Sequence, residues 1–281
     1  MSLRALPLVA VLMFHAIGNP GPYTISQRTF ADCLSMLRTE KVAVLTLGQF
    51  QRYMRGRFDL RRPSVLLTFD DGSRSDYTIA TPILRRFHDH ALAFLIGRRI
   101  GRDPSSLTPS EVRKMAKTGL WDFGSHTYNL HSGYGERQNL HYYAVHHISA
   151  RRALAEDIAR QYATFRRLGL PRPKAFAFPF GFYTREDFRQ LHRHFSLLFT
   201  SLSGYARPGQ RAIPRINIGS DFAGFPRLVD TVAEMLHTRP LAVMRHDRAA
   251  GPPHAHGTKR HTADSSTLRV LESRPATHAL A

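Results

Sequence analysis

Cysteine is almost absent from this chain of 281 residues, which has Cys33 alone. A single cysteine excludes an internal disulfide framework and every metal site built from several thiolates, so any bound metal must be held by histidine and carboxylate side chains. Long apolar runs are absent too. The best candidate, residues 6–14, is about half of the roughly 18 residues that span a bilayer. The sequence therefore predicts no transmembrane segment.

The apolar run at residues 6–14 has two interpretations. It follows Arg4 and could be the short core of a signal peptide, but no small-x-small cleavage site follows it. It ends instead at His15, as a buried strand would when it delivers a side chain to a site. The strand interpretation is favoured, so the sequence as written predicts a cytoplasmic protein.

Acidic residues are scarce. The chain has 40 Lys and Arg but only 21 Asp and Glu, a net charge of +19. Such an excess attracts nucleic acid, anionic glycans or a cell envelope. The arginines are dispersed over predicted helices and no nucleic-acid motif accompanies them, so we expect no nucleic-acid partner. The hydrophobic content of 42% is sufficient for a buried core.

Short apolar runs alternate with helical patterns along most of the chain. The runs typical of strands occupy residues 8–14, 42–45, 65–69, 92–96, 123–125, 175–178, 197–200 and 213–218. Helices are predicted after the N-caps Ser26, Thr108 and Thr184, and the longest one at about residues 148–168. This alternation is typical of β/α units in a mostly parallel sheet or barrel.

The pattern divides the chain in two. Residues 1–247 are predicted to form one domain, and residues 248–281 a disordered basic tail, because the tail is rich in Gly, Pro, His, Ser and Thr and has almost no apolar periodicity.

Two adjacent acids, Asp70 and Asp71, directly follow the apolar run at residues 65–69. Burying neighbouring carboxylates is costly, because each loses hydration and their charges repel. The carboxyl ends of parallel strands are where sites assemble, and a metal ion would explain both acids. An Asp-Asp-Gly turn without further function is the alternative.

Two histidines follow another apolar stretch, at His126 and His131. Helical pairs of metal ligands sit four residues apart, so a spacing of five suits a strand end and a turn. Two imidazoles and one carboxylate make a three-ligand site with an open position, as in catalytic zinc sites. Chance proximity among 16 histidines is the alternative. A third segment, residues 178–181 (FPFG), is by itself only a turn after a strand.

Together these segments resemble the polysaccharide deacetylase family, also called the NodB-homology domain. That family carries T-F-D-D-G, H-[ST]-x-x-x-H and a Pro-aromatic-Gly loop in this order, which correspond here to residues 68–72, 126–131 and 178–181. Residues 12–17 (LMFHAI) are similar to the Y-H-x-[IV] start of the branch that deacetylates poly-N-acetylglucosamine in biofilm matrix.

The resemblance implies a fold, a distorted (β/α) barrel with fewer than eight strands, and a metal-dependent hydrolysis of N-acetyl groups. It implies that Asp71, His126 and His131 hold one divalent metal, with zinc preferred and cobalt or nickel as alternatives. Asp70 would be the general base that takes a proton from the attacking water. His15 would be the general acid that protonates the leaving amine.

The resemblance also places the Pro-aromatic-Gly loop, Pro179, Phe180 and Gly181, on the substrate side, with a backbone N–H near Phe180 supporting the oxyanion. Many members have an arginine before this loop that orients the base, but Ala177 stands at about that position here, so that support is expected to be missing. Arg215 is expected to reach the substrate or oxyanion from a strand end. His246 is the alternative general acid.

Three functional alternatives remain open. The same chemistry would serve O-acetyl esters of a glycan. A binding-only member could keep the fold and lose activity, given Ala177. A solvated basic surface that binds anionic polymers is the non-enzymatic interpretation. The expected partner is an acetylated glycan, and because the family works largely outside the cytoplasm, the resemblance points to a periplasmic or extracellular location.

Overall fold

The computed structural model describes residues 9–18, 23–131, 139–219 and 224–237. Its main sheet is formed by strands whose side chains are mostly buried. The strands are β1 (Val9–Phe14), β4 (Ala43–Val44), β5 (Ser64–Phe69), β6 (Ala91–Leu95), β7 (Trp121–Ser125), β8 (Ala175–Ala177), β9 (Leu197–Phe199), β10 (Tyr205–Ala206), β11 (Ala212–Ile213) and β12 (Ile216–Asn217). A separate small ribbon pairs β2 (Ala16–Ile17) with β3 (Thr24–Ile25).

The order of the main sheet is β10-β1-β5-β6-β7-β8-β9-β11, and β12 pairs with β1 while β4 pairs with β5. All pairings in this sheet are parallel except that of β10 with β1. β11 lies on β9 at one end of the sheet, and β12 lies on β1 at the other. Only Pro214 and Arg215 separate β11 from β12, so a two-residue bridge closes the sheet into a distorted barrel.

The predicted fold class, a distorted (β/α) barrel, is confirmed. Within the described residues the main sheet has ten strands, counting the two-residue strands. The hydrogen-bonded path from β10 to β11 has eight strands, so the expected number, fewer than eight, is too low; β12 pairs in addition with β1, and β4 with β5.

Alternate residues of the strands face opposite sides of the sheet, as the period of two requires. Val9, Val11, Leu66, Leu92, Phe94, Ala177 and Phe199 belong to an inner cluster. Helix α2 (Leu47–Met54) contributes Phe50 to this cluster, and its ring stacks on Phe199 at 5.8 Å. The inner cluster therefore fills the barrel below its carboxyl end.

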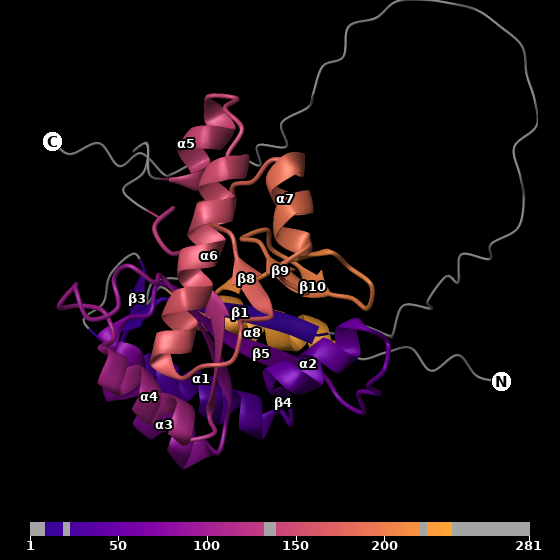
Figure 1. Cartoon of the computed structure of the whole chain (residues 1–281). Coiled ribbons are helices and arrows are strands. Elements are labelled where there is room, and N and C mark those ends of the chain that lie inside the picture. Colours follow the sequence, from indigo (N-terminus) through magenta and orange to yellow (C-terminus); the bar gives the residue numbers. More distant parts are fainter. Residues whose placement is uncertain (1–8, 19–22, 132–138, 220–223, 238–281) are drawn as a thin grey trace, which may run out of the picture.

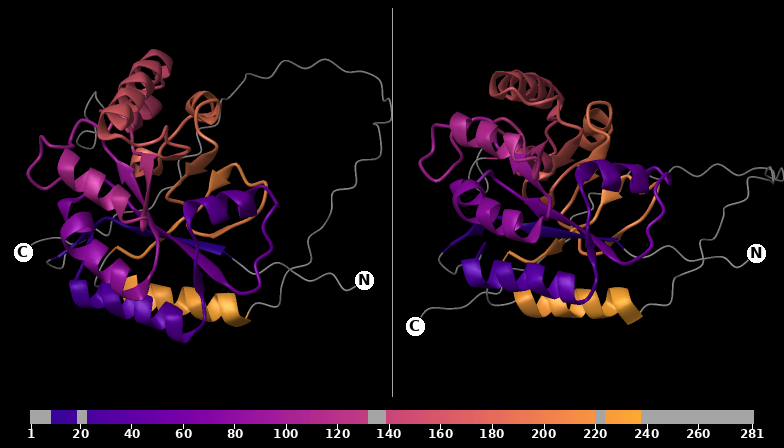
Figure 2. Two further views of the ribbon diagram at one scale, coloured as in Figure 1. Left: turned by 60° about the horizontal axis from the view of Figure 1, so that its bottom comes forward. Right: turned by 90° about the horizontal axis from the view of Figure 1, so that it is seen from below.

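The outer face is covered by helices (Figures 1 and 2). Around β1, β5 and β6 these are α1 (Gln27–Thr39), α3 (Thr81–Phe87), α4 (Pro109–Lys117) and α8 (Gly224–His237). In Figure 2, α1 and α8 lie side by side beneath the sheet. Around β8 and β9 the cover is α5 (Leu140–Val145), α6 (Arg151–Leu168) and α7 (Arg185–His192). Two short helical turns complete the elements, η1 (Asp76–Ala80) and η2 (Pro179–Gly181).

The helix starts follow the predicted caps. Ser26, Thr108 and Thr184 each accept a backbone N–H with their side chains, and the last two form capping boxes. The apolar run before His15 is the fully buried strand β1, as the favoured interpretation expected. The predicted strand at residues 213–218 is instead split at Pro214 and Arg215.

Some expectations fall where the structure gives no description. Residues 238–281, which include His246 and the predicted tail, lie outside the described residues. In the part that is described, no helix is long and apolar enough to cross a membrane.

Candidate active site

Four side chains singled out in the sequence follow three parallel strands. His15 follows β1, Asp70 and Asp71 follow β5, and His126 follows β7. The carboxyl ends of parallel strands lie on one rim of a barrel, so the topology itself brings these residues to one place. His131 joins them from the loop after β7.

Asp70 points into the mouth of the barrel. It continues the alternation of Leu66 and Thr68 along β5, and it is only 2% exposed. Both of its carboxylate oxygens accept hydrogen bonds from the guanidinium of Arg215, Oδ1 at 2.7 Å and Oδ2 at 2.8 Å. This is the bidentate geometry that makes arginine–carboxylate pairs strong and directional.

Arg215 is itself 1% exposed and held from several sides. Its Nε donates to the carbonyl of Thr200 at 2.9 Å, and its guanidinium lies 5.5 Å from the centre of the Phe94 ring. It stands in the two-residue bridge between β11 and β12. The charge pair therefore lies at the seam where the barrel closes.

The pair determines the charge of Asp70. Burial alone raises the pKa of this carboxyl, but the charges of Arg215 and His126 and the hydrogen bonds from Arg215 outweigh it and hold the pKa well below the usual range. Asp70 is therefore a carboxylate throughout the neutral pH range.

This geometry corrects two expectations about arginine. The base was expected to lack an orienting guanidinium because Ala177 occupies the usual position, but Arg215 supplies one from the bridge between β11 and β12. Arg215 was also expected to face the substrate or oxyanion, whereas its side chain is buried and committed to Asp70 and Thr200. Arg215 therefore holds Asp70, the expected base, from the buried side of the site.

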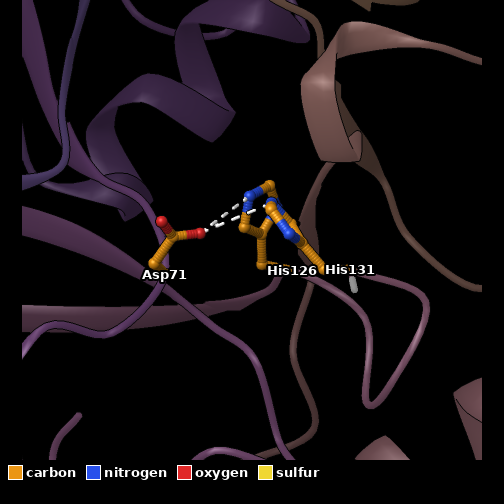
Figure 3. A group of neighbouring side chains, drawn as sticks. All are labelled: Asp71, His126 and His131. Atoms are coloured by element: carbon orange, nitrogen blue, oxygen red, sulfur yellow. Dashed lines mark ion pairs between the residues drawn. The ribbon is translucent and has the colours of Figure 1, made fainter. Parts of the chain in front are cut away.

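Asp71, His126 and His131 point toward one another (Figure 3). Oδ1 of Asp71 lies 3.6 Å from Nε2 of His126 and 3.4 Å from Nε2 of His131. The ligand-capable atoms of the three residues all lie within 4.8 Å of one another, and they form the one such group found among the described residues. Asp71 has a φ of 72°, a left-handed conformation that Asp tolerates better than most residues. Asp70 also reaches this group, because its Oδ2 lies 3.8 Å from Nε2 of His126.

The donor chemistry of this group fits a divalent cation. Nδ1 of His126 lies 2.9 Å from the carbonyl oxygen of Ala177, which can only accept, so this nitrogen carries the proton and Nε2 has a free lone pair. Burial, more than any neighbouring charge, lowers the pKa of His131 to about 4, which keeps that ring neutral at pH 7. Oδ1 of Asp71 is buried and makes no hydrogen bond. Two imidazole Nε2 atoms therefore converge on a buried carboxylate oxygen that makes no hydrogen bond, a donor set suited to metal.

His15 lies at the same rim but outside this group. Its Nδ1 is buried and makes no hydrogen bond within the described residues. Its charge acts on Asp70, where it lowers the pKa, and its ring lies 5.5 Å from that of Tyr23. Tyr23 is 63% exposed, so one flank of the site is an open aromatic surface.

The Pro-aromatic-Gly loop forms the opposite flank. The ring of Phe180 lies 4.6 Å from that of His131 and is 41% exposed. Pro179 has no N–H, and Gly181 donates its own to Phe178, so an oxyanion contact from this loop would involve the amide of Phe180. Gly181 has a φ of 76°, and a Cβ there would lie 1.8 Å from Oγ of Ser201. Only glycine allows the loop to take this path.

Taken together, the fold and the site define a class: an α/β barrel with a two-histidine, one-carboxylate group at its carboxyl rim beside a buried Asp–Arg pair. The sequence model of the polysaccharide deacetylase family matches residues 58–195. The structure of IcaB from Ammonifex degensii is similar to this chain with a TM-score of 0.71 and 30% identity, and the similarity covers 80% of this chain and 97% of that one. The chain belongs to the polysaccharide deacetylase family.

Other comparisons agree with this assignment. Two curated relatives named poly-β-1,6-N-acetyl-D-glucosamine N-deacetylase, from Staphylococcus epidermidis and Staphylococcus aureus, are 35% and 34% identical over 115 residues. Each match spans 39% of this chain and 39% of the relative, so about two fifths of the relatives' length is represented. The Streptococcus pyogenes deacetylase PplD, solved in complex with acetate, shares the fold with a TM-score of 0.66 and 22% identity.

Proposed function

We propose that the chain hydrolyses the N-acetyl groups of a polysaccharide or oligosaccharide that contains N-acetylglucosamine, and releases acetate. The observation that carries this proposal is the Asp71, His126 and His131 group beside a second carboxylate, Asp70, held ionised by Arg215. The names of the relatives from Staphylococcus support the choice of poly-N-acetylglucosamine as the substrate class.

The metal ligands in this proposal are Asp71, His126 and His131, with zinc as the preferred ion. A bound divalent cation supplies Lewis acidity, because it polarises a carbonyl oxygen and lowers the pKa of water. The carbonyl of Ala177 keeps the His126 ring oriented for this role.

Asp70 acts as the general base that accepts a proton from the attacking water. Arg215 occupies one lone pair on each of its oxygens, which keeps the carboxylate ionised and fixes its orientation, and a second lone pair remains on each oxygen. The same pairing weakens Asp70 as a base, so it can act only on water whose own pKa is low.

His15 acts as the general acid. The amine that leaves must take up a proton, and His15 is the imidazole at this rim that is not part of the ligand group. The amide of Phe180 is the proposed contact for the oxyanion.

The exposed rings of Tyr23, which directly precedes β3, and of Phe180, in η2, flank the site. Exposed aromatic side chains beside a polar site are typical of ligand-binding surfaces, and their flat apolar faces suit sugar rings. A glycan strand lying between them would present an acetamide to Asp70.

Hydrolysis of O-acetyl esters on a glycan is the second candidate, because the same residues would serve an ester carbonyl. The test is acetate release from N-acetylglucosamine oligomers and from an O-acetylated glycan, each with and without a chelator. We expect chelator-sensitive release from the amide substrate. Release only from the ester would replace the first proposal with the second, and release from neither would favour a glycan-binding protein without activity.

A further inference from the structure

The loop that carries the two histidines is anchored by a carboxylate from a distant helix. Asp157, in α6, accepts the backbone N–H of Tyr128 with Oδ1 and that of Asn129 with Oδ2, both at 2.7 Å. The next amide, that of Leu130, donates to Oγ1 of Thr127 within the loop at 3.1 Å. Asp157 is 6% exposed, and it touches neither His126 nor His131 through any of these bonds. One side chain therefore accepts the N–H groups of two successive residues between two metal-ligand candidates.

The other side of the loop is bonded to β6 and its extension. The carbonyl of Thr127 accepts the N–H of Gly97 at 3.1 Å, and the carbonyl of Tyr128 accepts that of Arg98 at 2.8 Å. The backbone carbonyls of the loop thus bond to the segment after β6, whereas its amides bond to Asp157 in α6. These bonds to Gly97 and Arg98 use carbonyls of the loop and provide no acceptor for its amides. The amides of Tyr128 and Asn129 therefore depend on Asp157 as their acceptor.

The loop is also strained. Thr127 has a φ of 69°, a left-handed conformation that is a marked outlier for a β-branched residue. Such conformations cost free energy and persist only where surrounding contacts determine them. Thr127 directly follows His126, so relaxation at this residue would rotate the path of the chain toward His131.

The charge of Asp157 suits this task. Burial raises its pKa to about 6 although the amide bonds act in the opposite direction, so at pH 7 the carboxylate form predominates. In that form all its lone pairs accept, whereas an amide at the same position would turn a donor toward one of the loop N–H groups.

We propose that Asp157 is a positioning residue that holds the 126–131 loop in its strained path, so that Nε2 of His126 and Nε2 of His131 both face Asp71, and that it thereby sets the metal affinity of the site. This inference rests on the proposed function, because it concerns the same ligand group. Asp157 itself contacts neither substrate nor metal.

Asp187 in α7 offers a matched control. It is 1% exposed, burial raises its pKa too, and it accepts the backbone N–H of Thr184 at 2.9 Å in the capping box of its own helix. It is thus a buried carboxylate bonded to a backbone amide, but that amide does not lie between metal ligands.

The experiment is a titration of each metal-free protein with Co²⁺, followed by the visible absorption of the bound ion, together with thermal melts of the metal-free proteins. We expect Asp157→Asn to weaken Co²⁺ binding by about 10- to 100-fold, as is typical for residues that orient metal ligands. Asp187→Asn should change the Co²⁺ affinity by less than about 3-fold. It should lower the melting temperature of the metal-free protein about as much as Asp157→Asn does. Asp157→Glu keeps the charge but moves the carboxylate, so its affinity should lie between that of Asp157→Asn and that of the wild type.

The outcomes separate the possibilities. Wild-type affinity in Asp157→Asn, or an equal loss of affinity in Asp187→Asn, would overturn the positioning role and leave the proposed function standing. If the wild-type protein itself binds no Co²⁺, the proposed function fails, and this inference fails with it. Should Asp157→Asn not fold, Asp157→Glu decides: the longer side chain displaces the loop, so an affinity equal to that of the wild type would contradict the proposal.

Discussion

The first and second parts of the barrel contribute different things to the site. Strands β1, β5, β6 and β7 are five or six residues long, and the residues proposed for the chemistry follow three of them. Strands β8 to β12 are two or three residues long and contribute contacts that hold those residues in place. The Ala177 carbonyl orients His126, and Arg215 orients Asp70.

The difference indicates that reactive groups and their supports are encoded separately along the chain. A long, fully paired strand holds its last residue firmly, so a reactive side chain there needs only a few further contacts. The short late strands position little by themselves, but they close the barrel and bring their carbonyl and guanidinium groups to the rim. We therefore expect changes in the early part to remove chemistry and changes in the late part to alter stability and orientation.

The largest effect is expected for His126→Ala. The variant should lose its divalent metal and its acetate release together, because one of three ligands is gone. Metal analysis after gel filtration and a thermal melt would measure both. Unchanged metal content in a folded variant would remove His126 from the ligand set.

Asp70→Asn should keep the metal and lose activity by about 10²- to 10⁴-fold, because the amide cannot accept a proton from water. It also leaves Arg215 buried without a counter-charge, so the variant should be assayed well below its melting temperature. Loss of metal from this variant, rather than from Asp71→Asn, would mean that the roles of the two acids are exchanged.

His15→Ala should retain the metal and lower the rate by about 10²-fold, because the leaving amine loses its proton donor. His15→Gln keeps a similar size without a titrating group and serves as a second variant. If both remain nearly as active as the wild type, the general acid lies elsewhere.

Arg215→Lys tests the late part and should have the smallest effect on chemistry. Lysine cannot reproduce the two-pronged contact with Asp70, so we expect a loss of about 1–3 kcal/mol of unfolding free energy at pH 7. The folded pKa of Asp70 lies below its unfolded value of about 3.9, so the stabilisation by the pair is complete above that pH and is lost as the pH falls toward the folded pKa. Urea melts at pH 7 and pH 3 should show the difference between wild type and variant shrinking at the lower pH.

The sequence allowed the prediction of the β/α alternation, the capped helices and the strand ends that carry Asp70, Asp71 and His126, because these depend on local periodicity and spacing. It did not allow the prediction that Arg215 pairs with Asp70, since the two residues are 145 positions apart and nothing in the local pattern links them. The break at Pro214 and Arg215 was missed for a related reason: an apolar run looks continuous even when its two ends pair with different strands. The proline within it, which cannot donate a ladder hydrogen bond, was the available signal.

The bridge at Pro214 and Arg215 also couples local opening of the barrel to the ion pair between Arg215 and Asp70. The amide of Arg215 donates to Leu202 on the β9 side, and three residues later the amide of Ile218 donates to Met13 on the β1 side. A fluctuation that parts β11 from β12 must therefore pull the guanidinium away from Asp70 and leave a buried carboxylate unpaired. The electrostatic cost of that event adds to the free energy of local opening at Pro214 and Arg215. We therefore expect slow hydrogen exchange of the Arg215 amide.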